Sequence, residues 1–199
     1  MTSMGRITNL LCAAGFVSHG SRRAFIKTAA FSSKKNYHLV GTGTASNTKI
    51  KTSTKHEIVT DVPKSMGGSN LAAQPVEYLL ASYIGCTQAT ALFVGRNMVP
   101  RLLIDRIEYD IHGDRDQDGA IGCLPIDEHS EFPSAPARLS AINGQITVYA
   151  KNRKGDQICL TKNELSLLEI HTERRCPVAN MITMSGCEIN VKWIDGNAP

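Results

Sequence analysis

Acidic residues are missing from the first 56 positions of this 199-residue chain. That segment holds nine of the 22 Lys and Arg residues, and the first acidic side chain is Glu57. The other 13 basic residues face all 18 Asp and Glu residues, so the rest of the chain is mildly acidic although the whole sequence carries +4. A mildly acidic body without a basic stripe binds nucleic acid poorly, and we expect no nucleic-acid partner.

The first 35 residues have the composition of an organellar presequence. They are rich in Arg, Lys and Ser, contain scattered apolar residues and have no Asp or Glu. A secretory signal fits less well, because the apolar run 10–17 is short and is followed by further basic residues. We therefore predict a disordered, presequence-like segment over 1–35, import into the mitochondrial matrix, and a folded domain over 36–199. A basic tail without a targeting role is the alternative.

Signatures of metal, nucleotide and hydrolase chemistry are also missing. The sequence has no C-x-x-C, no zinc-finger spacing, no P-loop, no dinucleotide fingerprint and no G-x-S-x-G. Asp114, Asp116, Asp118 and Gly119 imitate half of a calcium loop, but the position of its final glutamate is Pro125, which favours a solvated acidic turn. No run approaches the roughly 20 apolar residues of a membrane span. We expect no metal, no bound cofactor and no membrane span.

Strand and helix signals are segregated along the chain, which predicts an α+β fold rather than a doubly wound one. We expect strands over 37–44, 50–54, 56–62, 103–112, 138–150 and 187–194, and helices over 75–97, 161–172 and 176–182. A polar insertion occupies 113–137, and Asn143-Gly144 suggests a β-bulge. The helix over 75–97 has no charged residue between Glu77 and Arg96, so we expect it to be buried.

Two of the six cysteines lie in well-defined helical contexts. Cys86 is deep in the apolar helix, whereas Cys176 precedes Pro177 and therefore occupies or adjoins a helix N-cap. Unpaired backbone N–H groups and the preceding arginines favour the thiolate of Cys176. A redox couple is one hypothesis for this pair, and simple packing of Cys86 in a buried helix is the other. The remaining cysteines are expected to be plain loop or buried thiols: Cys12, Cys123, Cys159 and Cys187.

The pattern Pro75-x-Glu77-x-Leu79-Leu80-x(5)-Cys86, followed by Cys176-Pro177-Val178, resembles the OsmC/Ohr family of osmotically inducible and organic hydroperoxide resistance proteins. The resemblance covers about residues 37–195. It implies an OsmC-like fold of antiparallel sheets packed on two buried central helices, in an intertwined homodimer with active sites at the subunit interface. It also implies a thiol peroxidase that reduces organic or lipid hydroperoxides. Cys86 would attack the peroxide, Cys176 would resolve the sulfenic acid, and a dithiol such as lipoamide would restore both thiols.

Peroxidases of that family activate the first cysteine with an early-strand Arg and a Glu directly after the helix-opening Pro. Here the glutamate comes one residue later, as Glu77, and one helical residue rotates a side chain by about 100°. The strands over 37–62 contain no arginine, so the candidate basic residues are Lys49, Lys51 and Arg175. These departures keep an alternative function open: a non-catalytic dimeric redox sensor or small-ligand-binding protein of the same fold.

Overall fold

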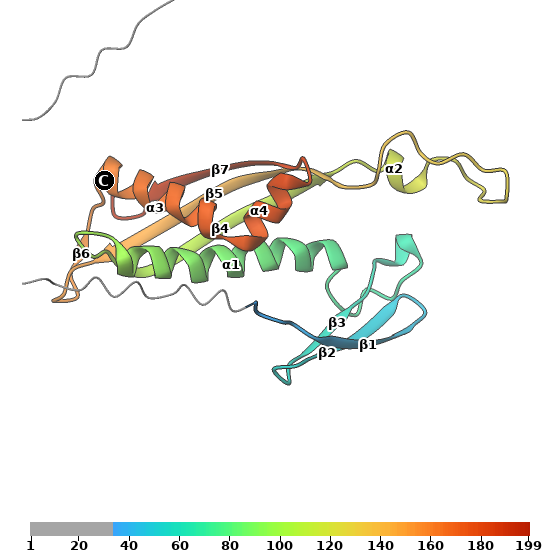
Figure 1. Cartoon of the computed structure of the whole chain (residues 1–199), viewed down its shortest axis with the longest axis horizontal. Helices are drawn as coiled ribbons and strands as arrows, with labels where there is room; N and C mark the ends of the chain where they lie inside the picture. The colour runs from blue at the N-terminus through green and yellow to red at the C-terminus, as the bar shows by residue number, and fades with distance from the viewer. Residues whose placement is uncertain (1–33) are drawn as a thin grey trace, which may run out of the picture. The chain divides into compact units, whose positions relative to one another are not determined.

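A computed structural model describes residues 34–199, and all elements named below belong to one unit, 38–199 (Figure 1). The predicted presequence over 1–35 therefore lies almost entirely outside the described residues. The elements are β1 (Leu39–Thr44), β2 (Asn47–Thr52), β3 (Glu57–Thr60), a 3-10 helix (Lys64–Met66), α1 (Pro75–Asn97), β4 (Leu103–Arg115), α2 (Asp118–Ile121), β5 (Leu139–Lys151), β6 (Gln157–Ile158), α3 (Lys162–Arg175), α4 (Pro177–Met184) and β7 (Glu188–Asp195).

The three-stranded meander predicted near the start of the domain is present, with order β1-β2-β3 and antiparallel pairing. The first hairpin closes through the pair Thr44 and Asn47, so β2 begins three residues earlier than expected. Only Ala45 and Ser46 remain in the turn, and Ala45 adopts a left-handed φ of 53°. The meander is linked to α1 by a hydrogen bond of 2.8 Å from the Tyr78 hydroxyl to the Val59 carbonyl.

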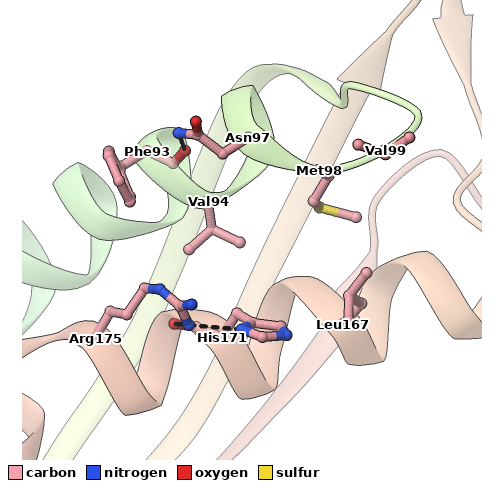
Figure 2. A pocket seen from close by; sticks show the side chains of 8 residues that line it. All are labelled: Phe93, Val94, Asn97, Met98, Val99, Leu167, His171 and Arg175. Atoms are coloured by element: carbon pink, nitrogen blue, oxygen red, sulfur yellow. Dashed lines mark hydrogen bonds between the residues drawn. The ribbon is translucent and has the colours of Figure 1, made fainter. Parts of the chain in front are cut away.

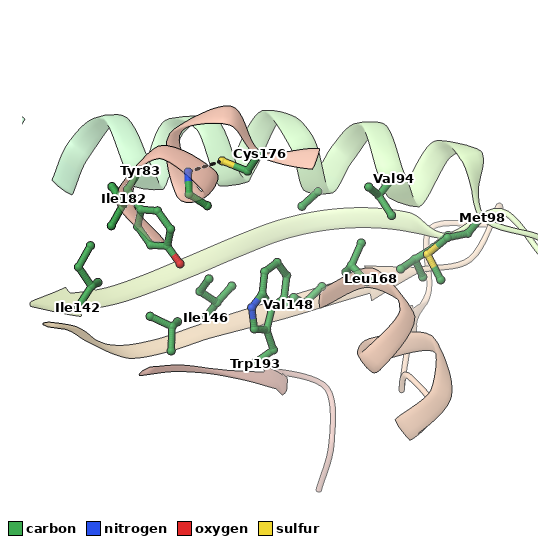
Figure 3. Close-up of a cluster of buried hydrophobic side chains, with 14 of the residues drawn as sticks. Tyr83, Val94, Met98, Ile142, Ile146, Val148, Leu168, Cys176, Ile182 and Trp193 are labelled. Atoms are coloured by element: carbon green, nitrogen blue, oxygen red, sulfur yellow. Dashed lines mark hydrogen bonds between the residues drawn. The ribbon is translucent and has the colours of Figure 1, made fainter. Parts of the chain in front are cut away.

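The second sheet supports the helices and the core. β5 pairs antiparallel with β4 and β6, and in parallel with β7. α1, α3 and α4 pack against this sheet, and Figure 3 shows the core between them and the strands. Its fully buried side chains include Tyr83, Ile142, Ile146, Val148, Leu168 and Cys176. The α+β prediction is confirmed. The parallel pairing of β7 was not anticipated, and it arises because α3 and α4 form a crossover that returns the chain in the direction of β5.

α1 begins and ends as its sequence predicts. Gln74 is the N-cap, Pro75 is the first helical residue and Glu77 completes a capping box. Only one face is buried in the single chain, at Tyr83, Thr87, Ala91, Val94 and Gly95. The Phe93 side chain is 54% exposed and Leu79 is 41% exposed. The expected complete burial is thus not reached within one subunit, because the sheet and the other helices cover a single face.

α1 contradicts the expectation that no run of the sequence is long and apolar enough to span a membrane. By length and composition alone, Pro75–Asn97 would suffice to cross a bilayer. Core helices of globular domains can pass the same test, and the Tyr83–Val94 face of α1 packs in the core described above. The long apolar run therefore carries little weight as an argument for membrane insertion.

The predicted bulge at Asn143-Gly144 is wrong. Both residues pair regularly with β4, and the register changes elsewhere, between Ile104 and Arg106 and between Asp114 and Arg115. Gly144 has a φ of +142°, and a Cβ there would collide with the carbonyl oxygen of Asp110. The glycine is required by the close approach of two regularly paired strands rather than by an extra residue.

The insertion expected over 113–137 begins later than predicted, because β4 continues to Arg115. Its acidic residues organise a local turn. Asp116 accepts a hydrogen bond of 2.8 Å from the backbone N–H of Asp118, where the short helix α2 begins. The rest is an irregular, mostly exposed loop that rejoins the sheet at Leu139.

Candidate functional site

Cys86 and Cys176 are neighbours in the fold although 90 positions separate them in the sequence. Cys86 lies in the middle of α1, and Cys176 lies at the junction of α3 and α4. The Cys86 side chain packs against the core cluster that contains Cys176 and is close enough to raise the pKa of the Cys176 thiol, and Thr87 Oγ1 lies 4.0 Å from Cys176 Sγ. Packing of α1 against α3 and α4 therefore creates the thiol pair.

Cys176 caps two helices. The Cys176 N–H donates to the Thr172 carbonyl at 2.9 Å at the end of α3, and the Cys176 Sγ accepts a hydrogen bond from the Ala179 N–H at 3.4 Å at the start of α4. The predicted N-cap is confirmed. Pro177 follows at the first helical position, where a missing N–H has no cost. Two helix ends thus hold this sulfur in place.

The expected thiolate at Cys176 is not favoured. The residue has no exposed surface, and burial raises the pKa of its thiol. The adjacent Cys86 side chain raises this pKa further, whereas the Ala179 N–H and the Thr87 hydroxyl lower it in part. The sequence argument weighed only the helix terminus and the arginines. It did not include the desolvation of the charged form, which has the largest effect.

Cys86 differs from Cys176 in its access to solvent. Cys86 is half-buried, whereas Cys176 is completely buried. The Thr90 hydroxyl donates to the Cys86 carbonyl at 2.8 Å within α1. Since solvent touches only one thiol of the pair, a dissolved oxidant meets Cys86 first.

Two tyrosines near the thiols were missed by sequence reasoning. Burial raises the pKa of Tyr83 to about 12, with further contributions from the charges of Glu173 and Cys176. Burial also raises the pKa of Tyr109, whose hydroxyl donates to Gln88 Oε1 at 2.9 Å. Both phenols are therefore protonated and neutral around the thiol pair at neutral pH. A usable signal for Tyr83 was its i, i+4 spacing from Thr87, which places both side chains on one face of α1.

Comparisons with known proteins place this geometry in a family. A sequence profile described as OsmC, OsmC-like protein, matches residues 67–192, which is more than half of the chain. The chain belongs to the OsmC-like family. That match spans both thiols, Cys86 and Cys176. Among curated proteins, no sequence matches the chain significantly.

Solved structures agree with the OsmC-like fold. An OsmC-like protein from Mycoplasma pneumoniae superposes with a TM-score of 0.58 at 19% identity, covering 81% of this chain and 97% of that one. An organic hydroperoxide resistance protein from Elizabethkingia anophelis gives 0.58 at 15% identity, with 83% and 99% covered. An organic hydroperoxide resistance protein OsmC from Legionella pneumophila gives 0.53 at 16%, with 80% and 96% covered. At these identities the similarity establishes the fold.

The single OsmC-like chain does not bring Glu77 to the thiols. The Glu77 carboxylate accepts the Gln74 N–H at 2.7 Å in the capping box of α1. Glu77 precedes Cys86 by nine residues, which is about 13.5 Å along a helix axis. Within one subunit its carboxylate therefore serves the start of the helix, and a role at Cys86 requires the partner subunit of a dimer.

The candidate basic residues are not at Cys86 either. Lys49 and Lys51 lie exposed on β2. Arg175 adjoins Cys176 in the sequence, but its Nη1 is 2.6 Å from His171 Nδ1 on the same helix. Among residues 34–199, no hydrogen bond or ion pair joins a basic side chain to Cys86. The structure thus unites the two thiols and leaves the proposed activating groups elsewhere in the chain.

The other cysteines lie apart from this pair. Cys123 is exposed in the insertion, and Cys159 is exposed and donates to the Asn197 carbonyl at 3.0 Å. Cys187 is buried, whereas Cys12 lies outside the described residues. In the part of the chain that the structure describes, no three His, Cys, Asp or Glu side chains gather as metal ligands.

Proposed function

We propose that this OsmC-like protein is a thiol-dependent peroxidase that reduces organic or lipid hydroperoxides through Cys86 and Cys176. The observation that carries the proposal is the proximity of an accessible thiol to a buried one. The family match and the names of the Legionella and Elizabethkingia neighbours support hydroperoxide chemistry. Antioxidant defence is the corresponding physiological role.

The proposed reaction has two steps. The Cys86 thiolate attacks the distal oxygen of ROOH, the O–O bond breaks, and the alkoxide leaves and takes a proton to become ROH. Cys86 is then a sulfenic acid. The Cys176 sulfur attacks it, the S–S bond forms, and the hydroxyl group leaves as water with a proton from Cys176. Both oxidising equivalents of the peroxide end in the disulfide.

The surroundings of Cys176 favour this order of events. While Cys86 is a thiolate, its charge raises the pKa of Cys176, so the buried thiol stays protonated and unreactive toward the peroxide. Oxidation of Cys86 to a neutral sulfenic acid removes that charge. The Ala179 N–H and the Thr87 hydroxyl continue to lower the pKa of Cys176. Cys176 thereby becomes more nucleophilic when a partner for it exists.

The proposal also names a substrate class and a reductant. The apolar side chains of α1 around Cys86 suit an alkyl hydroperoxide better than hydrogen peroxide. The enzyme is proposed to need no bound cofactor, because an external dithiol such as lipoamide can reduce the disulfide by exchange. Residues 1–35 support import into the mitochondrial matrix, where lipoamide is available. Retention of matrix import after deletion of residues 1–33 would contradict this localisation.

Stopped-flow kinetics with t-butyl hydroperoxide and reduced lipoamide tests the peroxidase. We expect Cys86→Ser to abolish turnover, because no accessible thiol of the pair remains. Cys176→Ser should reduce one equivalent of peroxide and then stop, with Cys86 as sulfenic acid or a more oxidised form. The matched control is Cys159→Ser, which removes an exposed thiol that donates to the Asn197 carbonyl and not to either thiol of the pair. Unchanged turnover in Cys86→Ser would refute the assignment, and faster reduction of hydrogen peroxide would refute the substrate class.

A second function is favoured by one observation: among the described residues, no basic group reaches Cys86. Without activation, the pair would suit a dimeric redox sensor or a small-ligand-binding protein. A sensor would form the disulfide only at stoichiometric, slow rates and would not turn over with a dithiol. Multiple turnovers in the experiment above therefore support the enzyme, and a single slow oxidation supports the sensor.

A further inference from the structure

Thr87 places a hydroxyl group beside Cys176 in the core. Thr87 follows Cys86 on α1, and one helical residue turns its side chain by about 100°, onto the buried face of the helix. Thr87 is 2% exposed, and its Oγ1 lies 4.0 Å from Cys176 Sγ. Two consecutive residues of α1 therefore have different surroundings: solvent reaches Cys86, and Thr87 contacts the buried sulfur.

Cationic side chains do not stabilise a thiolate at Cys176. Among residues 34–199, none of them forms a hydrogen bond or ion pair with it. Arg175 precedes Cys176 in the sequence, but Figure 2 shows its guanidinium directed to His171, and Nη1 lies 2.6 Å from Nδ1. The ionisable side chains close enough to act on Cys176 electrostatically carry no positive charge: Cys86, Tyr83 and Tyr109. Since Cys176 has no exposed surface either, negative charge on its sulfur depends on neutral hydrogen-bond donors.

Two such donors lie at Cys176 Sγ. One is the backbone N–H of Ala179 at 3.4 Å, and the other is the hydroxyl of Thr87. While Cys176 is a thiol, either the sulfur or the hydroxyl can donate; once Cys176 is a thiolate, only the hydroxyl can. A hydrogen bond to a charged group is shorter and stronger than a neutral one. The contact with Thr87 therefore strengthens as negative charge develops on the sulfur.

We propose that Thr87 is a further catalytic residue, whose hydroxyl donates to the Cys176 sulfur in both halves of the peroxidase cycle. This inference rests on the proposed function. In the oxidative half, Cys176 Sγ forms a bond to Cys86 Sγ, the S–O bond of the sulfenic acid breaks, and the hydroxyl group leaves as water with the proton of Cys176. Thr87 stabilises the negative charge that develops on Cys176 during this step.

In the reductive half, Cys176 is the leaving group. Solvent reaches Cys86 and not Cys176, so one thiolate of the dithiol attacks Cys86 and forms a mixed disulfide. The electron pair of the broken S–S bond stays on Cys176, which accepts the hydrogen bond from Thr87 and then takes up a proton. The second thiol of the reductant attacks the mixed disulfide, releases Cys86 and closes a cyclic disulfide. A thiolate of lower pKa leaves faster, so the same hydrogen bond assists both directions.

The rate of disulfide formation also decides how often Cys86 is lost. A second peroxide molecule can oxidise its sulfenic acid to a sulfinic acid, which thiols do not reduce. Attack by Cys176 competes with this reaction. Thr87 therefore sets the peroxide concentration at which the enzyme is inactivated.

Rapid-quench mass spectrometry with t-butyl hydroperoxide tests the oxidative half on the full chain. The sulfenic acid, trapped with dimedone, and the disulfide differ in mass, so the two steps are followed separately. In Thr87→Val, which exchanges the hydroxyl for a methyl group, we expect Cys86 to be oxidised at the wild-type rate. Disulfide formation should be at least about tenfold slower, because a hydrogen bond to a charged group is lost. Sulfinic acid at Cys86 should appear at lower peroxide concentration.

Thr172→Val is the matched control. Thr172 is fully buried and lies one turn before Cys176 on α3, but within the described chain its Oγ1 has no hydrogen-bond partner. This variant should form the disulfide at the wild-type rate. Thr87→Ser and Thr87→Ala give the same comparison without Thr87→Val, because both lose the methyl group and only the alanine loses the hydroxyl. Thr87→Ser should be fast and Thr87→Ala slow, and equal rates in these two would overturn the role of the hydroxyl.

Reduction of the preformed disulfide tests the other half. Reduced lipoamide should open it about tenfold more slowly in Thr87→Val than in the wild type. The monothiol 2-mercaptoethanol, quenched with acid, should leave its adduct on Cys86, and an adduct on Cys176 would overturn the assignment of the leaving group. Disulfide formation at the wild-type rate in Thr87→Val would overturn the role of Thr87 and leave the peroxidase intact. Absence of a Cys86–Cys176 disulfide in the oxidised wild type would overturn both together.

Discussion

Asp61 is a buried carboxylate that joins three segments of the chain. It has no exposed surface and accepts hydrogen bonds from the Ser46 hydroxyl at 2.7 Å and from the N–H groups of Val62 at 2.8 Å, Leu71 at 3.0 Å and Ser69 at 3.2 Å. These bonds, the one from Leu71 first, lower the pKa of Asp61 to about 2. The first hairpin, the end of β3 and the loop before α1 therefore depend on one charge.

Protonation or replacement of Asp61 should loosen this arrangement. A carboxylate whose pKa is lower in the folded state contributes stability that is present above its unfolded pKa, 3.8, and is lost as the pH falls toward about 2. We expect urea denaturation to show lower stability at pH 2 than at pH 5 in the wild type. The difference should be smaller in Asp61→Asn, which should also be less stable at pH 7. Asp110→Asn, on an exposed strand position, is the control. Equal pH dependence of the two variants would contradict this prediction.

Cys176 shows how two local effects compete at one residue. A helix N-terminus stabilises a thiolate by roughly 0.3–1 kcal/mol, whereas complete burial of an unpaired charge costs several kcal/mol. The direction of the pKa shift at Cys176 follows the larger effect. A cysteine at a helix start is therefore activated only where water or a cation also reaches it.

At the scale of elements, α1 depends on its first turn. The box formed by Gln74 and Glu77 satisfies N–H groups that the helix itself leaves unpaired. We expect Glu77→Ala to reduce the free energy of unfolding by about 1 kcal/mol, because this cap is lost. Glu77→Gln retains an acceptor oxygen and should cost much less. Chemical denaturation with circular dichroism measures both.

The same two variants test the family-derived role of Glu77. If the carboxylate activates Cys86 of a partner subunit, Glu77→Gln should lose peroxidase activity while it keeps its stability. Equal activity of Glu77→Gln and the wild type would leave Glu77 with its capping role alone. The comparison separates the two roles because only the activating role requires the negative charge.

At the scale of the whole molecule, the uncovered face of α1 bears on assembly. Ala81, Gly85 and Ala89 follow one another at four-residue spacing, and all three are exposed in the single chain. No atom lies within 4 Å of a Cβ built on Gly85. Small side chains let a second helix approach closely, so this face suits packing against a partner subunit.

We therefore predict a homodimer by light scattering at micromolar concentration. Ala89→Arg should shift the protein toward a monomer, because the partner cannot accommodate a charged side chain at a close helix contact. Ser166→Arg, on the exposed part of α3, should remain dimeric. A monomeric wild type would refute the assembly, and dimeric Ala89→Arg would place the interface elsewhere.

Local features of the sequence were sufficient to predict part of this structure. The bounds of α1 and the N-cap at Cys176 depend on prolines, caps and apolar spacing within a few residues, and these signals act over short distances. The pattern around Cys86 and Cys176 was also sufficient to identify the family. The meander before α1 was predicted with errors of a few residues, because hairpin register is decided by cross-strand pairs.

Contacts between distant segments decided the rest. The parallel pairing of β7, the regular pairing at Gly144 and the burial of Cys176 all depend on which segments pack together. The residues adjacent to Cys176 in the sequence do not show that packing removes its thiol from water. They therefore predicted a thiolate, whereas burial favours the protonated thiol. The sequence determined the elements and the identity of the two thiols, and the tertiary structure decided their proximity, their accessibility and their protonation, since these quantities arise from long-range packing.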